Sequence, residues 1–469
     1  MQCYDLDVPA NRQTGSTARV SVHAARFLPR GADPGAPPLY TVLGGPGQSW
    51  TDGNAGARFA ERIEPSEVDA LGREVVLLEQ RGTGESLPVT RCDAVSGFQV
   101  LSAADAAADA ATQLADCRQT LRAAGVDVAG FNVVELAEDV EALRQSLGHG
   151  RIFLAGTSYG TRISLEYLRR HADALAGVIL DSVLPPERPA LAHGARDVWR
   201  SFEAIFDACG LDADCNAAFP NAKSGFLTLL NELEGVPIVL GSTGVQIGPR
   251  ELLMLLIFGF SSRPGDIPAA VNAVRNPALR LALLAPRTAL VAAGAMGRAL
   301  EETVLAKGMF HSITCADNTG LDQGAIDAQM PDLPNVSAAR SAARFSLDLV
   351  AGICGSWGAQ ALAPETLAPV VNSDVPVLMV QGSFDTLTPA VWAQSAAAGL
   401  ARSQRVALAG AGHSPIGLIV DGGGRVSCPK QLARAFLRDP GTSVDATCAA
   451  AITPSFATNV DLLGALSQL

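Results

Sequence analysis

Short apolar runs that alternate with helical patterns constrain the fold of this chain more than any other feature. They form an N-terminal and a C-terminal group, at residues 38–45, 73–80, 151–158 and 176–183, and at residues 375–382 and 405–412. Runs that are apolar throughout are typical of parallel strands covered on both faces. Apolar spacing predicts helices over 135–148 and 161–171, whereas residues 16–29 alternate and predict an antiparallel edge strand. The pattern predicts an α/β fold with a mostly parallel, doubly wound sheet.

The strand pattern stops between about Pro189 and Pro369, where helical stretches are broken by Pro and Gly. An insertion between strands of an open sheet lies over their C-terminal ends, where ligands bind in this class of fold. We therefore expect a core in two parts, residues 1–187 and 370–469, with a helical cap domain inserted at residues 188–369.

Composition narrows the class of protein. Hydrophobic residues make up 48% of the chain and charged residues 17%, which is typical of a globular protein. The net charge of −12 argues against nucleic-acid binding, because phosphates need a basic surface. The apolar segment 251–260 is too short to span a bilayer, and the run 281–300 contains Pro286, Arg287 and Arg298, so we expect no membrane span.

Nine cysteines bear on the compartment of the protein. Eight of them lie near one another in pairs and predict four local disulfides, Cys92 with Cys117, Cys209 with Cys215, Cys315 with Cys354, and Cys428 with Cys448. Cys3 is left over, and the alternative is nine ordinary buried thiols. The chain opens MQCYDLDVP, without a signal peptide, so we expect a secreted or periplasmic protein whose leader is absent from this chain.

Residues 155–162, AGTSYGTR, contain the pattern Gly-x-Ser-x-Gly with Ser158 at its centre. The pattern follows a predicted strand directly and precedes a predicted helix. A catalytic serine on a sharp turn requires this context, and Gly156 and Gly160 leave room for the close approach of strand and helix. The alternative is an ordinary loop in which the serine caps the helix. The context favours a nucleophile.

A serine nucleophile needs a base and an acid that orients the base. His413, in LAGAGHSP, lies just past the last predicted strand, and Asp385, in VLMVQGSFDTLTP, follows the strand before it. The order Ser158, Asp385, His413 is the nucleophile–acid–base order of α/β hydrolases. The alternatives are a turn aspartate and a surface histidine, and His311 is the only competing histidine.

The oxyanion of an acyl-transfer reaction needs backbone donors. The N–H of Tyr159, next after the serine, is one candidate. The loop LGGPGQSW, residues 43–50, follows the first strong strand and can supply the N–H of Gly45, unless it is a plain Gly-Pro turn. No Cys-x-x-Cys or Cys/His cluster predicts a metal site.

Several segments together resemble one known family. They are LGGPGQS, EQRGTGES, AGTSYGTRISLEYLRR, VILDSVLPP, GSFDTLTP and GAGHSP. The chain is similar, from about Cys3 to Cys448, to the proline iminopeptidase and tripeptidyl aminopeptidase family of serine hydrolases. SITCADN and CGSW resemble its secreted tripeptidyl-aminopeptidase-like branch most. The resemblance implies an α/β-hydrolase core with a helical cap, the triad Ser158, Asp385 and His413, exopeptidase chemistry at peptide N-termini, and no metal or organic cofactor.

The chain departs from the family pattern at three places. Leu43 stands where proline iminopeptidases have His, Glu79 stands where Asp is common, and Asp317 stands where relatives often carry Glu. An aminopeptidase must hold a protonated amine, for which a cap carboxylate is the natural partner. Asp317 is the leading candidate for this amine partner, followed by Glu203, Glu232 and Glu301. The alternative for each of them is a solvated acid or one that caps a helix. Trp357 is either a wall of the substrate pocket or a core residue, and we expect Arg81 to tie loops together beneath the site.

The sequence therefore predicts a serine exopeptidase that acts on small peptides, with a monomer favoured. The alternative is a carboxylesterase that uses the same triad on small or aromatic esters. A second alternative is a non-catalytic binding protein on a hydrolase scaffold. Neither nucleic acid nor a membrane is an expected partner.

Overall fold

An eight-stranded sheet forms the centre of the protein, with strand order β1-β2-β4-β3-β5-β6-β9-β10. Its strands are β1 Gln2–Pro9, β2 Arg19–Phe27, β3 Leu39–Val42, β4 Val75–Leu78, β5 Ile152–Thr157, β6 Leu175–Asp181, β9 Val377–Gly382 and β10 Ser403–Leu408. Six strands of this sheet run parallel to one another, namely β4, β3, β5, β6, β9 and β10, whereas β2 is antiparallel to both of its neighbours, β1 and β4. The mostly parallel sheet expected from the sequence is confirmed.

This computed structural model describes most of the chain. The described residues are 1–31, 33, 35–51, 63–92, 104–188, 190–240, 245–276, 306–318, 340, 354–355, 357–370, 372–417, 419–420 and 426–458. The apolar run 281–300 and the acid Glu301 lie outside them. The apolar segment 251–260 coincides with helix α9, Pro249–Gly259.

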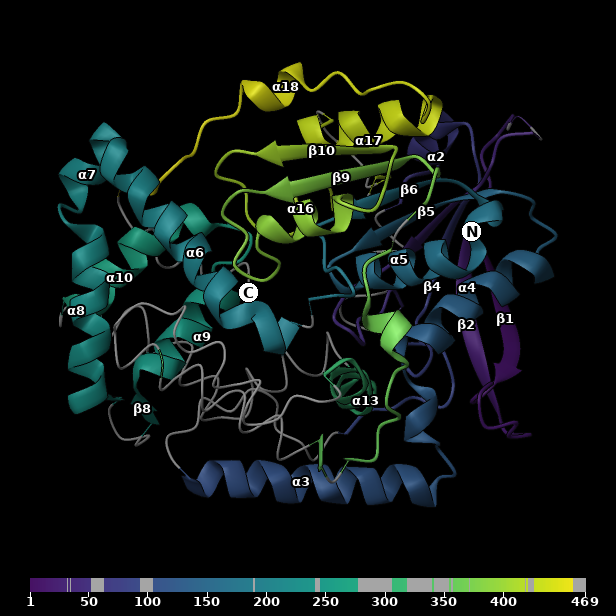
Figure 1. Cartoon of the computed structure of the whole chain (residues 1–469), viewed down its shortest axis with the longest axis horizontal. Coiled ribbons are helices and arrows are strands. Elements are labelled where there is room, and N and C mark those ends of the chain that lie inside the picture. The colour runs from purple at the N-terminus through teal and green to yellow at the C-terminus, as the bar shows by residue number, and fades with distance from the viewer. Residues whose placement is uncertain are drawn as a thin grey trace.

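The two faces of the sheet bury alternate residues of each strand in different cores. In β5, Ile152 and Leu154 belong to one core, whereas Phe153 belongs to the other. The first core holds α4 (Val133–Ser146), α5 (Tyr159–His171) and α16 (Val391–Ala397), and the second holds α17 (Cys428–Arg438) and α18 (Thr447–Ala450). Figure 1 shows α16 and α17 on opposite sides of β9 and β10. Helices thus cover both faces, which explains why the strands are apolar throughout.

Helices follow β6 and precede β9; in Figure 1, α6 to α10 lie to the left of the sheet and α13 lies below it. They are α6 Ala190–Leu211, α7 Ala213–Ala218, α8 Ala222–Gly235, α9, α10 Ile267–Arg275 and α13 Lys307–Asp317, with the hairpin β7 Ile238–Leu240 and β8 Val245–Ile247. Helices α6, α8, α9 and α10 share a core of their own around Phe226. We call residues 188–369 the cap segment; its boundaries stay a prediction.

The remaining elements are short or peripheral. They are α2 Pro65–Leu71, α3 Ala104–Ala123 and the 3-10 helices η1 Val128–Gly130, η2 Ala172–Ala174, η4 Pro264–Asp266 and η6 Pro364–Leu367. The structure joins all four predicted cysteine pairs, and Cys3 is free and exposed on β1.

One expectation is wrong in detail. The alternating segment 16–29 contains β2, which is antiparallel as expected but is not at the edge of the sheet, because β1 pairs along its whole length. Strand β1 is itself the edge, and most of its residues are exposed or half-buried.

Within the described part of the chain, no helix has the length and apolar character needed to cross a membrane.

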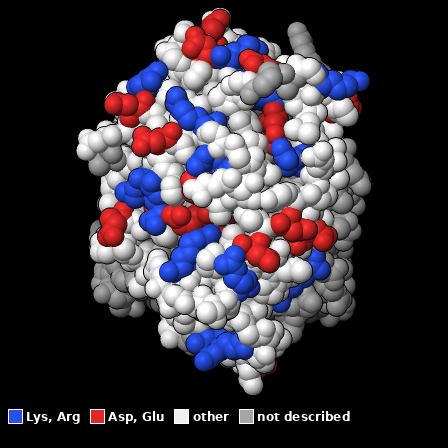
Figure 2. All heavy atoms as spheres, turned by 90° about the vertical axis from the view of Figure 1, so that its right-hand side faces the viewer, with Lys and Arg blue, Asp and Glu red and all other residues white. Residues whose placement is uncertain are grey.

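Figure 2 shows the face at the β1 edge of the sheet. Lys and Arg side chains of the described residues are interspersed there with Asp and Glu side chains and gather in no large patch of one sign.

Candidate active site

Ser158 lies on a sharp turn between β5 and α5. Its backbone has φ 55° and ψ −122°, a left-handed conformation that side chains rarely adopt. Such a conformation costs about 1–3 kcal/mol and persists only where the surroundings enforce it. The turn holds the serine at the first residue before the helix, where the free N–H groups and the helix dipole favour negative charge. This is the geometry of a nucleophile elbow.

The two glycines that flank Ser158 are required by close backbone contacts. A Cβ atom on Gly156 would lie 2.2 Å from the carbonyl oxygen of Gly160, and one on Gly160 would lie 2.4 Å from the carbonyl oxygen of Val42. No side chain fits at these distances. The two glycines of the pattern around Ser158 therefore allow the close packing of α5 against β5 and β3.

Asp385 and His413 form an ion pair beyond the ends of β9 and β10. The Nδ1 atom of His413 lies 2.9 Å from Oδ2 and 3.1 Å from Oδ1 of Asp385. Asp385 is fully buried, and it also accepts hydrogen bonds from the N–H groups of Leu387 and Thr388, both at 2.9 Å, and from the Thr388 hydroxyl at 2.8 Å. The Nε2 atom of Gln381 donates a further hydrogen bond, at 3.1 Å. The acid is thereby fixed as an acceptor for the imidazole.

These contacts set the charges of the pair. Burial by itself raises the pKa of Asp385, but the charge and hydrogen bond of His413 outweigh it and hold the pKa below its ordinary value. Burial lowers the pKa of His413, and the Asp385 carboxylate outweighs this and raises it. The imidazole is therefore a stronger base than an isolated buried histidine would be, which suits a group that takes a proton from a serine.

The end of β6 holds the serine turn and the histidine loop together. The N–H of Ser158 donates to the carbonyl oxygen of Asp181 at 2.9 Å. The carboxylate of the same residue accepts from the N–H groups of Ile416 and Gly417, at 3.2 Å and 3.1 Å. The N–H of Ser414 donates to the hydroxyl of Ser182 at 2.8 Å. Strand β6 thus fixes the predicted nucleophile and the predicted base relative to one another.

The cap segment contacts the loops that carry the acid and the base. The Ser201 hydroxyl, on α6, donates to the carbonyl oxygen of Asp385 at 2.6 Å. The N–H of His413 donates to the carbonyl oxygen of Ser261, just after α9, at 2.8 Å. A Cβ atom on Gly412 would lie 2.0 Å from the same oxygen, so the approach is close. These cap helices therefore lie over the C-terminal ends of β9 and β10.

The loop after β3 passes directly over Ser158. A Cβ atom on Gly44 would lie 2.7 Å from Cβ and 3.1 Å from Oγ of Ser158. The next residue, Gly45, has φ 100°, and its N–H has no hydrogen-bond partner among the described residues. The N–H of Tyr159 is the first of α5, where helix geometry leaves no intrahelical partner. The structure thus brings both predicted oxyanion donors to the neighbourhood of the serine.

Asp317 does not fit its predicted role as a free partner for a substrate amine. It ends α13 and is buried, and its Oδ2 atom lies 2.9 Å from Nε of Arg162, which is also buried. Burial raises the pKa of Asp317, and the Arg162 charge opposes this. Tyr159 lies beside the pair, and burial and then the Asp317 charge raise the pKa of its hydroxyl. The carboxylate therefore already has a cation on α5, which the sequence of α13 alone did not reveal.

The other substrate candidates are dispersed. Trp357 is 1% exposed, donates from Nε1 to the Ser312 hydroxyl at 2.8 Å and packs 5.5 Å from the His311 ring. These contacts favour the alternative of a core tryptophan over a pocket wall. Glu203 and Glu232 are surface residues of α6 and α8, and Glu203 lies 3.9 Å from the ammonium group of Lys223.

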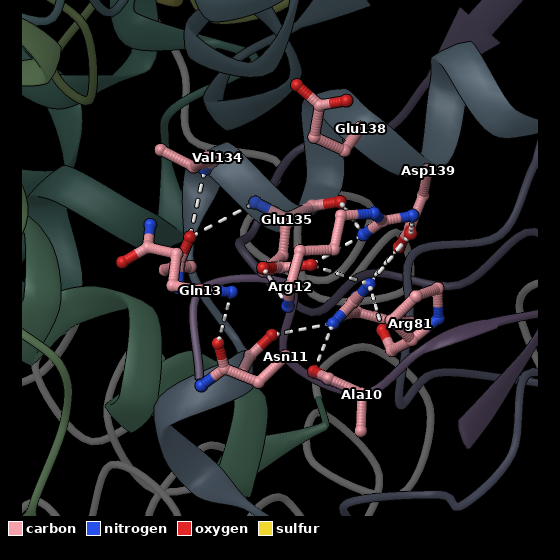
Figure 3. Close-up of polar contacts among 12 residues, drawn as sticks. Ala10, Asn11, Arg12, Gln13, Arg81, Val134, Glu135, Glu138 and Asp139 are labelled. Atoms are coloured by element: carbon pink, nitrogen blue, oxygen red, sulfur yellow. Dashed lines mark hydrogen bonds and ion pairs between the residues drawn. The ribbon is translucent and has the colours of Figure 1, made fainter. Parts of the chain in front are cut away.

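Arg81 ties loops together, as expected. Its guanidinium pairs with Asp139 at 2.7 Å and donates to the carbonyl oxygens of Ala10 and Gly130, at 2.7 Å and 2.8 Å. Figure 3 shows that Arg12 approaches Asp139 on α4 from the other side. All of these partners belong to the protein itself, so Arg81 acts as a structural residue.

Comparison with known proteins agrees with this fold. Residues 37–209 match a family described as alpha/beta hydrolase fold, and residues 341–448 match one described as TAP-like protein. The chain is a hydrolase of the α/β-hydrolase fold, with a serine at the position of the nucleophile. Within that class, it is of the tripeptidyl aminopeptidase-like kind.

Among curated proteins, the chain is similar to serine protease Hip1 from Mycobacterium tuberculosis and from Mycobacterium bovis, with 26% identity over 231 residues in each case. The match covers 46% of this chain and 42% of each relative, so it spans less than half the length of the curated relatives. Among solved structures, a proline iminopeptidase from Mycobacterium smegmatis shares 14% identity, with 93% of this chain and 98% of that one covered and a TM-score of 0.42. A thermophilic esterase from Thermogutta terrifontis shares 15% identity, with 94% and 100% covered and a TM-score of 0.38.

Sequence reasoning missed three residues of the site. Gln381 and Thr388 both bind the Asp385 carboxylate, and Asp181 binds the histidine loop. Burial raises the pKa of Asp181 to about 7 in spite of its hydrogen bonds. Their only signal was that each lies at or just after the end of a predicted strand, near a residue already singled out.

Proposed function

We propose that the protein is a serine exopeptidase that releases N-terminal residues, proline or a di- or tripeptide, from short peptides. The observation that carries the proposal is the joint anchoring, at the end of β6, of a strained Ser158 and of a His413 paired with Asp385. The match to a TAP-like family and the likeness to a serine protease support a peptide bond as the target.

The mechanism follows from the roles that the geometry allows. The Ser158 hydroxyl adds to the carbonyl carbon of the scissile bond while Nε2 of His413 takes its proton. Asp385, bound to Nδ1, holds the tautomer in which Nε2 is an acceptor. The N–H groups of Gly45 and Tyr159 stabilise the oxyanion. The proton then passes from His413 to the leaving amine, and water repeats the sequence on the acyl-enzyme.

A carboxylesterase is the second candidate, and one observation favours it. The ion pair of Asp317 with Arg162 leaves the predicted amine partner already neutralised. An ester substrate needs no amine partner, and its leaving group needs less protonation. The two candidates share the same roles for Ser158, His413 and Asp385, and they differ in the leaving group and in what the cap segment recognises.

A substrate panel separates the two candidates. Alanyl, prolyl and Ala-Ala-Pro p-nitroanilides are compared with their N-acetylated forms and with p-nitrophenyl acetate and butyrate. The exopeptidase proposal expects kcat/KM for a free amine to exceed that of its acetylated form by at least tenfold. Equal rates for free and blocked amides, with faster turnover of the esters, would favour the esterase.

The nucleophile is tested by one substitution and one label. Ser158→Ala is expected to keep its melting temperature and to lose activity and labelling by a fluorophosphonate probe. Ser224→Ala, on α8, removes a hydroxyl that donates to the carbonyl oxygen of Asn221, the residue that precedes the same helix, and it serves as the control with normal activity. Near-normal turnover by Ser158→Ala, or a labelled peptide that lacks Ser158, would refute the assignment.

We further propose that the protein works as a monomer outside the cytoplasm, in a secreted or periplasmic location. Four disulfides support this location, because such bonds persist in oxidising compartments. Mass spectrometry of the protein recovered from culture medium or periplasm, without reductant, is expected to find all four bonds. Recovery in the cytoplasm with reduced thiols would contradict the location, and a dimer in light scattering would contradict the monomer.

A further inference from the structure

The segment EQRGTGES, residues 79–86, has no part in the mechanism above except through the structural Arg81. It follows β4, which lies beside β3 in the sheet. The first two side chains of this segment, Glu79 and Gln80, are 1% and 2% exposed and turn toward the loop that passes over Ser158. We call residues 43–51 the oxyanion loop.

Gln80 contacts the first part of the oxyanion loop at both of its polar atoms. Its Nε2 atom donates to the carbonyl oxygen of Gly44 at 2.8 Å and to that of Leu43 at 3.1 Å. Its Oε1 atom accepts from the N–H of Gly47 at 3.3 Å. One side chain thus binds backbone groups on both sides of Gly45 and leaves the N–H of Gly45 itself unused.

Glu79 contacts the last part of the same loop. Its carboxylate accepts from the N–H groups of Trp50 and Thr51, the latter at 2.6 Å, and from the Thr51 hydroxyl at 2.9 Å. The Thr83 hydroxyl, from the same segment, donates to its other oxygen at 2.8 Å. Burial raises the pKa of Glu79, and these hydrogen bonds oppose the rise. The carboxylate therefore fixes the C-terminal end of the loop through N–H and O–H donors.

The chemistry of the two side chains is matched to the backbone groups that they meet. A side-chain amide donates from its nitrogen and accepts at its oxygen, so Gln80 satisfies carbonyl oxygens and an N–H at once. A carboxylate at the same position would face the oxygens of Leu43 and Gly44 with no hydrogen to offer. Gly44 itself lies against Ser158, so a shift of this loop changes the position of the Gly45 N–H relative to the nucleophile.

We propose that Gln80 is a positioning residue that holds the Gly45 N–H where the oxyanion forms, with Glu79 fixing the far end of the same loop. This inference rests on the proposed acyl transfer at Ser158. Preorganised donors stabilise a transition state because they need not reorient when charge develops. Gln80 thus acts on the reaction through Gly45 and does not touch the substrate.

The test uses Gln80→Met, which keeps the length of the side chain and removes both polar atoms. Loss of one oxyanion donor costs about 10²–10³ in kcat, and we expect a displaced donor to cost about 10- to 100-fold. The KM for p-nitrophenyl acetate is expected to change less than threefold. Phenylboronic acid, which forms a tetrahedral adduct with a serine, is expected to bind more weakly by the same factor as the loss of kcat.

The matched control is Tyr167→Phe on α5. It removes a buried hydrogen bond from the tyrosine hydroxyl to Glu141, 2.7 Å long, in the helix that follows the nucleophile. We expect a lower melting temperature with unchanged kcat and unchanged boronate affinity. A general loss of stability is thereby separated from a loss of oxyanion stabilisation.

Each outcome decides the proposal. A kcat within threefold of the wild type, or a loss of kcat without loss of boronate affinity, overturns it. If Gln80→Met does not fold, Gln80→Glu, which keeps the acceptor and removes the donor, is measured instead, and failure of both variants to fold assigns Gln80 to folding and overturns the proposal. A wild type that the fluorophosphonate probe does not label at Ser158 overturns the proposed function as well, whereas labelling with normal Gln80→Met kinetics overturns this inference alone.

Discussion

Replacing Gly44 by alanine tests the placement of the oxyanion loop over the nucleophile. The new Cβ atom would lie 2.7 Å from Cβ of Ser158 and 2.9 Å from the carbonyl oxygen of Thr157, where ordinary contacts begin at 3.4 Å. Gly44 does not have a positive φ, so alanine can adopt its backbone conformation and the effect comes from the side chain alone. The loop and the serine must therefore separate by roughly 0.7 Å, and a displacement of about 1 Å costs about 10²-fold in rate.

We therefore expect Gly44→Ala to reduce kcat for p-nitrophenyl acetate by roughly 30- to 100-fold, with a similar fall in the rate of fluorophosphonate labelling. Overpacking costs about 1–3 kcal/mol, so the protein should remain folded, which a thermal melt followed by circular dichroism will show. Gly150→Ala is the control, because a Cβ atom there meets nothing within 4 Å. Activity of Gly44→Ala within threefold of the wild type would refute the placement of the loop.

Three further predictions concern the acid, a disulfide and the end of β6. Asp385→Asn is expected to lower kcat by about 10⁴-fold. Because the Asp385 charge outweighs burial in raising the pKa of His413, its loss should move the acid limb of the kcat/KM profile to lower pH, and an unmoved limb would contradict this cause. Replacing Cys315 and Cys354 by serine opens a link across 39 residues and should lower the free energy of unfolding in urea by about 4 kcal/mol; an unchanged midpoint would contradict it. The folded pKa of Asp181, about 7, exceeds its ordinary 3.8, so this group destabilises the fold increasingly as pH rises between those values. Asp181→Asn should therefore flatten the fall in melting temperature between pH 4 and pH 7, and an identical slope in both proteins would count against it.

The sheet was predictable because its strands are buried on both faces. The six apolar runs contain β3, β4, β5, β6, β9 and β10, with ends that differ by a few residues. Strand β1 was not predicted, because its residues alternate between exposed and half-buried environments and polar side chains interrupt the apolar ones. Its place in the sheet depends on its pairing with β2, and the local sequence pattern does not reveal which strand that partner is.

The residues of the candidate site likewise divide into those with a local signal in the sequence and those whose role depends on distant contacts. Ser158 carries a local signal, since its glycines, strand and helix are neighbours in sequence, and Asp385 and His413 each follow a predicted strand. The partner of Asp317 carries none, because Arg162 lies 155 positions earlier on another helix, and only the fold brings the end of α13 close to the start of α5. Roles that depend on such contacts between distant elements cannot be derived from a single sequence.

The contacts of the cap segment with the site have a consequence for the exchange of caps between related enzymes. The N–H of His413 donates to the carbonyl oxygen of Ser261, and the same oxygen lies so close to Gly412 that a side chain there would clash with it. A chimera that received a foreign segment between β6 and β9 would therefore change the surroundings of the proposed base, His413, together with its substrate specificity. Only a graft that kept both the turn after α9 and Ser201 on α6 native, and took foreign sequence elsewhere in the insertion, would let selectivity vary independently of turnover.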